Sequence, residues 1–358
     1  MKYLNALNKI NGVGAQKLKL LLDYFENGEN IWQAPVADII NVGISEKLAH
    51  TIISERPKIN PDYEWELLQK EDIQVIPFTS SEFPASLKEI SSTPYLIYVK
   101  GDLNIFSQPM LAMVGSRKFT SYGKQIAESL ARDLATAGIV VVSGMAMGID
   151  TFSHQGALMA NGKTIAVLGS GLDNNHIGPR QNFNLSRKII ANGALISDYP
   201  YGTQATNFTF PARNRLMAGL TMGTIVVEAE EKSGTLITAN LAVDFNREVF
   251  AVPGSIFSPA SQGANQLIKR GAKVITGVQD ILEELNLEKL KQEKIIKKII
   301  PDTLEEELII KNISTEATHI DRIIKATRLN TSIASSTLAI LEIKGIIKDI
   351  GGQNYIIL

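Results

Sequence analysis

The sequence predicts an α/β protein built on a doubly wound, parallel sheet, with a helical domain before it and a smaller domain after it. From Met110 onward, short apolar runs alternate with glycine-rich turns and helical stretches, which is the rhythm of a parallel sheet. The runs are also continuously apolar, as expected of strands covered on both faces. The predicted strands are Leu111–Val114, Ile139–Val142, Thr164–Leu168, Ala194–Ile196, Thr224–Val227, Glu248–Val252 and Lys273–Ile275.

Residues 1–60 are predicted to form a helical domain. Ile10–Leu18 has the pattern of a helix, a tight glycine turn and a second helix, and its glycines permit left-handed backbone angles. This resembles a helix-hairpin-helix (SAM-like) motif, whose turn amides can hold one DNA phosphate. Asn41–Leu48 looks like a second, degraded copy, because Asn41 stands at its first glycine position. The alternative is a small helical domain whose tight turns bind nothing.

A predicted linker, Pro57–Pro61, leads into a core domain over residues 62–285. The core begins with a predicted helix, Tyr63–Glu71, and two predicted strands, Gln74–Pro77 and Tyr95–Val99. These lead into the repeated strand and helix units.

Composition narrows the kind of protein. The chain has 358 residues, of which 44% are hydrophobic, as in a globular protein of two or three domains. The absence of cysteine excludes a disulfide scaffold, a cysteine zinc site and a thiol nucleophile, and it fits a cytoplasmic protein. We expect no signal peptide, no membrane span, no metal and no cofactor. With a net charge of −1, any basic surface must be local.

The binding chemistry is expected in the turns after the strands, because parallel strands deliver these turns to one edge of the sheet. The turns are rich in glycine, hydroxyl and basic residues. They are Gly115–Lys118, Ser143–Asp150, Gly169–Asp173, Glu228–Thr235 and Pro253–Ser255. The sequence contains no P-loop pattern, and Gly169-x-Gly171 lacks the third glycine of a dinucleotide-binding turn. The set therefore indicates a phosphate-bearing ligand without identifying it.

The stretch Phe208–Ala239 carries the densest group of phosphate-type ligands. Its polar members are Arg213, Asn214, Arg215, and the helix-start turn Ser233-Gly234-Thr235. Pro211 disfavours a helical conformation for the residue before it, so Phe210 is predicted to be extended, outside any helix, on the rim of the sheet. There its ring could stack on a base. The alternative is that Phe210 is a core residue.

These motifs closely resemble the DNA-processing protein A family, DprA or Smf, over residues 62–285. The matching segments follow the family's order. They are Val114–Arg117, Ser143–Asp150 with His154 and Ala157–Leu158, Val167–Asp173, Phe210–Arg215, Val227–Ala229, Ser233–Thr238, Arg247–Gly254, Gly263–Asn265, Leu267–Ile268 and Gly271–Ala272. One loop departs from the family, which usually carries a Tyr-Pro pair after Asp173. This chain has the longer Asn174–Arg180, in which Arg180 could add a phosphate contact.

The resemblance implies an extended Rossmann-like fold that forms a homodimer through its core and binds single-stranded DNA in a basic pocket. It implies a protein that protects incoming DNA during natural transformation and loads RecA recombinase. Arg117 and Phe210 match the family's DNA contacts: an arginine can fork onto a phosphate, and a phenyl ring can stack on any base. The predicted DNA-binding residues are Gly115, Ser116, Arg117, Lys118, Ser143, Gly144, Gly148, Gly169, Phe210, Arg213, Asn214, Arg215, Ser233, Gly234 and Thr235.

An enzyme is the rival interpretation, because the core also resembles Rossmann-like phosphoribohydrolases that cleave nucleoside monophosphates. Those enzymes carry Pro-Gly-Gly-x-Gly-Thr-x-x-Glu where this chain has Glu231–Thr238, so their downstream glutamate is replaced by Thr238. Loss of that carboxylate favours binding without turnover. We predict no catalytic residue and a protein that is not an enzyme.

Other charged residues near these turns are expected to be structural. His154 lies four residues after Asp150, and we expect a structural hydrogen bond between them instead of a catalytic dyad. Glu228, Glu230 and Glu231 are expected to shape their turn or to keep DNA from the wrong side.

The C-terminal part is predicted to be a Lys-rich amphipathic helix over linker residues 286–300, followed by a winged-helix domain over residues 301–358. The predicted elements are helices Leu304–Lys311, His319–Thr327 and Thr331–Lys344, and a two-stranded wing, Ile346–Ile350 and Asn354–Leu358. The third helix has almost no Lys or Arg, although a major-groove reader needs cationic phosphate contacts. This favours a protein-contact or weak DNA-binding module over a double-strand regulator.

Overall fold

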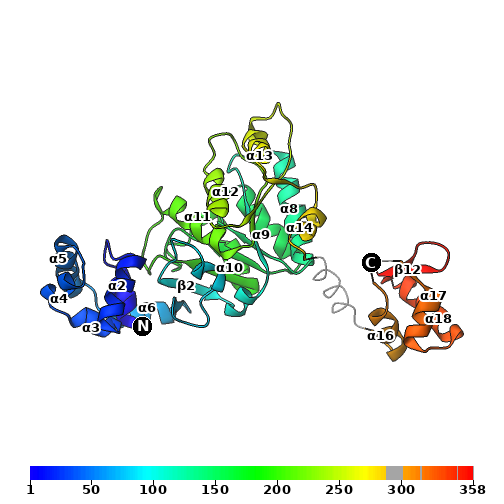
Figure 1. Cartoon of the computed structure of the whole chain (residues 1–358), viewed down its shortest axis with the longest axis horizontal. Helices are drawn as coiled ribbons and strands as arrows, with labels where there is room; N and C mark the ends of the chain where they lie inside the picture. The colour runs from blue at the N-terminus through cyan, green and yellow to red at the C-terminus, as the bar shows by residue number, and fades with distance from the viewer. Residues whose placement is uncertain (288–300, 315–316, 345, 358) are drawn as a thin grey trace. The chain divides into compact units, whose positions relative to one another are not determined.

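The computed structural model describes residues 1–287, 301–314, 317–344 and 346–357 (Figure 1). The chain divides into two compact units, Met1–Ile281 and Leu282–Leu358. Most of the Lys-rich helix predicted over 286–300 lies outside the described residues. None of the helices in the described ranges is long and apolar enough to cross a membrane.

A nine-stranded sheet organises the first unit, in the order β1-β2-β6-β5-β4-β3-β7-β8-β9. From β6 to β9 every neighbouring pair is parallel, which confirms the predicted doubly wound sheet. β1 and β2 extend the β6 edge as antiparallel strands. The strands are β1 (Gln74–Pro77), β2 (Leu96–Gly101), β3 (Met110–Val114), β4 (Val140–Ser143), β5 (Thr164–Val167), β6 (Gly193–Ser197), β7 (Gly223–Val226), β8 (Glu248–Ala251) and β9 (Lys273–Val274).

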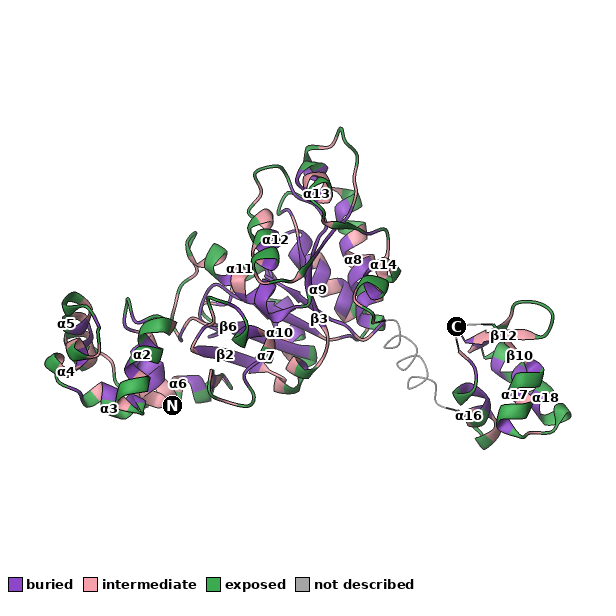
Figure 2. Cartoon of the chain, in the orientation of Figure 1, coloured by how far each residue is buried: buried purple, intermediate pink, exposed green. Residues whose placement is uncertain are grey.

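The inner strands, from β2 to β7 in the order of the sheet, are buried on both faces, as their continuous apolar sequences require (Figure 2). The edge strands β1 and β9 are partly or fully exposed. Ile165 and Val167 enter the larger apolar cluster, whereas Ala166 and Leu168 enter a second one, because successive side chains point to opposite faces of a sheet. The helices of this core are α7 (Ala85–Lys88), α8 (Ser121–Thr136), α9 (Ile149–Met159), α10 (Phe183–Asn192), α11 (Thr209–Leu220), α12 (Thr235–Asp244), α13 (Pro259–Lys269) and α14 (Val278–Glu284).

The N-terminal residues form the predicted helical region. Its helices are α1 (Lys2–Asn8), α2 (Ala15–Phe25), α3 (Gly28–Gln33), α4 (Val36–Asn41) and α5 (Glu46–Glu55). The next helix, α6 (Pro61–Lys70), is the one predicted at the start of the core, and its Leu68 is buried in a core cluster. Gly12 and Gly43 adopt φ values of 92° and 95°, so both predicted glycine turns need a residue without a side chain. The region packs on the core through Leu96, and the buried Tyr98 hydroxyl donates to Asn5 Oδ1 at 2.9 Å.

The second unit is a winged helix, as predicted. It contains α16 (Leu304–Lys311), α17 (Ile320–Thr327) and α18 (Thr331–Ile343), with β11 (Ile347–Asp349) and β12 (Asn354–Ile357) as the wing. A third short strand, β10 (Thr318–His319), pairs with β12, so the predicted two-stranded wing is a three-stranded sheet. A two-residue strand leaves no alternating pattern in the sequence, which is why it was missed.

Candidate functional site

The main pocket lies where the winding of the sheet reverses. The chain proceeds from β3 to β6 on one side and from β7 to β9 on the other. Val114 and Val226, the last residues of β3 and β7, are paired in register, so the turns that follow them diverge from adjacent points. Open α/β sheets bind ligands at such a switch point, beyond the carboxyl ends of the strands.

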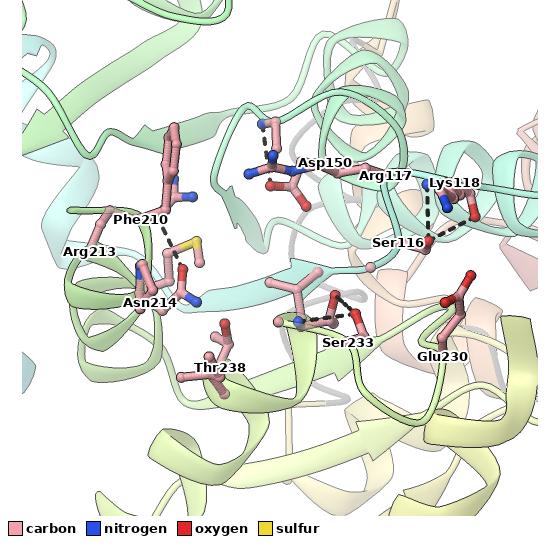
Figure 3. A pocket seen from close by; sticks show the side chains of 18 of the residues that line it. Ser116, Arg117, Lys118, Asp150, Phe210, Arg213, Asn214, Glu230, Ser233 and Thr238 are labelled. Carbon is pink, nitrogen blue, oxygen red and sulfur yellow. Dashed lines mark hydrogen bonds between the residues drawn. The ribbon is translucent and has the colours of Figure 1, made fainter. Parts of the chain in front are cut away.

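A pocket of about 390 Å³ opens at this point (Figure 3). Four segments surround it: the turn after β3, the turn after β4 that supplies Ala146 and Asp150, the first turns of α11, and the turn and first residues of α12. Its lining residues are Val114, Gly115, Ser116, Arg117, Lys118, Ala146, Asp150, Asn207, Phe210, Pro211, Arg213, Asn214, Met217, Glu230, Ser233, Gly234, Thr235, Ile237 and Thr238. The structure therefore brings together the predicted site residues of three turns that are far apart in sequence.

The turn after β3 is held by Ser116 and presents two cations. The Ser116 hydroxyl donates to the Lys118 carbonyl at 2.7 Å and accepts the Lys118 N–H at 3.0 Å. A Cβ on Gly115 would lie 2.6 Å from Ile149, so glycine is needed for the turn to approach α9. Within the described residues, the exposed side chains of Arg117 and Lys118 have no hydrogen bond or ion pair. Both are therefore available to an anionic ligand.

Arg117 and Phe210 form the centre of the site. The guanidinium carbon of Arg117 lies 5.3 Å from the centroid of the Phe210 ring, which is a cation–π contact. Both residues line the main pocket and also a second, mostly apolar pocket of about 220 Å³. The predicted residues Gly144 and Gly169 line this second pocket. A cation and an aromatic face thus stand together between two cavities.

Phe210 is the second residue of α11, so the prediction that it lies outside any helix is wrong. Proline is tolerated in the first turn of a helix, because its missing N–H would have no intrahelical partner there. Pro211 occupies such a position, and the Phe210 N–H still bonds to the Thr206 carbonyl at 3.3 Å. Helix geometry also explains the unpredicted lining residue Met217, seven positions later on the same face as Phe210.

Arg213 forms part of the buried floor of the pocket. Its side chain is only 4% exposed, and Nη1 donates to the Gly144 carbonyl at 2.8 Å and to the Val167 carbonyl. Burial lowers the pKa of Arg213 to about 10, against the attraction of Asp150, so the guanidinium remains charged at neutral pH. Burial raises the pKa of the Asp150 carboxyl, and the positive charge of Arg213 opposes that rise. The two opposite charges stabilise each other within the fold.

Some of the other predicted residues in α11 and in the turn before α12 line the pocket, whereas others make contacts that stabilise the fold. Asn214 lines the pocket, but Arg215 does not: it donates to the Ser92 carbonyl at 2.6 Å and pairs with Asp198. Ser233 Oγ accepts the Thr235 N–H at 3.2 Å, so this hydroxyl caps its own turn.

The predicted residues Ser143 and Gly148 contact the backbone near the pocket turns without lining a pocket. The buried Ser143 hydroxyl donates to the Met113 carbonyl at 2.6 Å. Gly148 has a φ of 92°, and a Cβ there would lie 2.5 Å from the Ser116 carbonyl oxygen. Neither residue lines either pocket, nor does the turn Pro253–Ser255, which follows a strand farther from the switch point. Asn207 and Ile237 line the main pocket without any pattern in the sequence that would have identified them.

His154 is structural, but it does not bond to Asp150 as predicted. The Thr164 hydroxyl donates its only proton to the Val141 carbonyl at 2.6 Å. It must therefore accept from His154 Nδ1, which lies 2.7 Å away. Burial and the charge of Arg213 lower the pKa of His154 to about 3, so the imidazole is neutral at neutral pH.

The acidic residues beyond β7 take different positions. Glu228 is 2% exposed and accepts the Thr120 N–H at 3.0 Å, so it shapes the start of α8. Glu230 is exposed and lines the pocket, where it adds negative charge opposite Arg117 and Lys118.

Comparison with known proteins identifies the family. Residues 74–286 match the family described as DNA recombination-mediator protein A, and residues 298–353 match the DprA winged helix domain. The chain is 34% identical to Protein Smf of Synechocystis, over 99% of this chain and 98% of that protein. It is 42% identical to the DNA processing protein DprA of Bacillus subtilis, over 61% of this chain and 73% of that protein.

Two solved structures are similar in fold and sequence. DNA processing protein A from Streptococcus pneumoniae is 35% identical, with a TM-score of 0.69 over 79% of this chain and 98% of that one. DNA processing protein A from Helicobacter pylori is 30% identical, with a TM-score of 0.54 over 60% of this chain and 95% of that one. Its structure is described as giving insight into a unique single-stranded DNA binding mode of that protein. From its sequence, its fold and its winged-helix domain, the present chain belongs to the DprA/Smf family of DNA processing proteins.

Proposed function

We propose that this protein binds single-stranded DNA in the switch-point pocket. The contact between Arg117 and Phe210 is the observation that carries the proposal, because it joins a phosphate ligand to a base-stacking face. Lys118 adds a second exposed cation at the same rim. Neither a flat ring nor a backbone-directed cation distinguishes one base from another, so binding should be largely independent of sequence. The single-strand binding mode described for the Helicobacter pylori relative supports this assignment.

The family extends the proposal to a cellular role. A recombination mediator that holds single-stranded DNA would protect incoming strands during natural transformation and pass them to RecA recombinase. We propose that the protein does so as a homodimer formed through its α/β core.

A mobility-shift titration over a salt series tests the binding function. Random-sequence single strands should bind more tightly than the matching duplexes, because the duplex hides the base faces that Phe210 needs. The logarithm of the affinity should fall with the logarithm of the salt concentration, by about 0.7 per phosphate contacted. Equal or tighter binding of the duplex would contradict the proposal.

The enzyme alternative predicts a different result with the same protein. We expect no release of free base from nucleoside monophosphates, measured by chromatography of the nucleobase. Thr238 stands where the related enzymes carry a glutamate, and Asp150 is only 6% exposed and is held beside Arg213. Glu230 is the exposed carboxylate of the pocket, so Glu230→Gln is the informative variant. Turnover by the parent that is lost in this variant would establish an enzyme.

A further inference from the structure

Two exposed phenyl rings adjoin the main pocket without belonging to its predicted DNA-binding set. Phe208 directly follows the lining residue Asn207, and its side chain is 88% exposed. Phe119 directly follows the lining residue Lys118, and its side chain is 44% exposed. Phenylalanine is among the residues most often buried, so two exposed rings beside one pocket call for a partner.

Hydrogen bonds hold the backbone that carries the first ring. The Thr206 N–H donates to Thr209 Oγ1 at 2.9 Å, and the Thr209 hydroxyl donates back to the Thr206 carbonyl at 3.1 Å. The Phe208 N–H donates to Thr206 Oγ1 at 3.3 Å. Because this backbone is already ordered, it loses little conformational entropy when the ring binds a ligand.

Phe208 and Phe210 cannot stack on the same base. Phe208 has helical backbone angles at the start of α11, with φ of −87° and ψ of −32°. Residues two positions apart on a helix point about 200° from each other. The ring of Phe208 therefore faces away from that of Phe210 and would hold a different base of the strand.

The second ring, Phe119, packs on a neighbouring aromatic residue. Phe119 packs edge-on against Phe152, with centroids 4.6 Å apart and planes at 80°. Lys124 lies over Phe152 at 5.2 Å. Phe119 thus keeps an exposed surface next to the exposed cation of Lys118, which would attract a phosphate chain, whereas Lys124 also pairs with Glu128 at 3.9 Å.

We propose that Phe208 and Phe119 extend the pocket into a base-stacking track for single-stranded DNA. Figure 3 shows Phe210 and Lys118 on opposite sides of the pocket. Phe208 lies two residues before Phe210 and Phe119 directly follows Lys118, so the two added rings would flank the pocket at both ends. The strand would run from Phe208, across Arg117 and Phe210, to Phe119. This proposal rests on the proposed function and adds the residues that hold the flanking bases.

Phe257 provides a matched control. It is 89% exposed and lies in the loop between β8 and α13, but it lines neither pocket. Alanine at Phe208 or Phe257 removes an almost fully exposed phenyl ring and should cost little stability. Phe119→Ala also removes the edge contact with Phe152, so its thermal unfolding is measured beside its DNA binding.

Equilibrium binding of the full chain to oligothymidine tests the track. Phe208→Ala and Phe119→Ala should each weaken binding by about five- to a hundredfold, the usual range for loss of one stacked base. Phe257→Ala should bind as the parent does. On an abasic oligonucleotide of the same length, all three variants should match the parent, because no base remains to stack. The salt dependence should be unchanged, since a phenyl ring releases no counterion.

Phe208→Trp supplies an independent readout. Its indole fluorescence should be quenched by oligothymidine and not by the abasic strand, after subtraction of the parent signal from Trp32 and Trp65. The proposal is overturned if Phe208→Ala or Phe119→Ala binds oligothymidine as tightly as Phe257→Ala does. Failure of the parent itself to bind oligothymidine would instead refute the proposed function.

Discussion

Replacing Arg213 with methionine should lower the free energy of unfolding by about 3–5 kcal/mol, the usual cost of leaving a buried charge without its partner. Arg213 is 4% exposed, and its positive charge opposes the desolvation of the Asp150 carboxylate. Its Nη1 also donates to two backbone carbonyls, those of Gly144 and Val167. Methionine fills similar space but supplies neither the charge nor the donors. Urea denaturation of the two proteins measures the difference.

The loss of folding stability caused by Arg213→Met should be larger at neutral pH than at low pH. Burial raises the pKa of Asp150 above its unfolded value, so this group stabilises the fold at low pH and loses that contribution as pH rises through the folded pKa. Without Arg213 the folded pKa of Asp150 rises further. The stability deficit of Arg213→Met should therefore shrink as the pH is lowered from neutral. Loss of Arg213 also makes His154 easier to protonate, which acts in the same direction.

Two further variants separate charge from packing. In the background of Arg213→Met, Asp150→Asn removes the stranded carboxylate and should recover part of the stability at neutral pH. Lys118→Met removes an exposed cation from the same pocket and should change stability by less than about 0.5 kcal/mol. A deficit in Arg213→Met that does not change with pH, and that Asp150→Asn does not relieve, would show that the lost hydrogen bonds alone account for it.

The sheet could be predicted from the sequence because its signal is local. Each strand of the parallel part is a short apolar run bounded by glycine or polar turns, as in Thr164–Val167 followed by Leu168 and Gly169. The edge of the sheet that would carry the ligand followed from the same pattern, since parallel strands end at one rim. The pairing of β2 with β6 could not be predicted in this way, because it joins segments about a hundred residues apart with no connecting motif.

The site was harder to predict because a residue type does not reveal its partner. Arg213, Asn214 and Arg215 are adjacent and were predicted to share one role. In the helix their side chains point in different directions. Arg213 donates to the Gly144 carbonyl, Asn214 lines the pocket, and Arg215 pairs with Asp198. The local bias of Pro211 suggested an extended Phe210, but the first turn of a helix accepts proline. Tertiary contacts decided each of these positions.

Phe210→Ala should weaken binding of single-stranded DNA by about five- to a hundredfold, the usual effect of losing one stacked base. Phe210→Tyr is the matched control, because it keeps an aromatic face and should retain most of the affinity. Phe210 is half-buried, so some stability will be lost, but less than the roughly 3–5 kcal/mol typical of a phenylalanine in a core. Thermal unfolding of the two variants checks this.

Because Arg117 and Phe210 are in contact, we expect their contributions to DNA binding to be coupled. Arg117→Ala should flatten the salt dependence by about 0.7, the value of one lost phosphate contact on a single strand. Because the guanidinium lies 5.3 Å from the ring centroid, each side chain helps to hold the other, and the double variant should lose less affinity than the two single losses combined. A double-mutant cycle in oligothymidine binding measures this coupling. If the losses are additive, the two residues act independently on DNA. If Phe210→Ala lowers the melting temperature sharply while its folded fraction binds normally, Phe210 is a core residue and its assignment to the site is wrong.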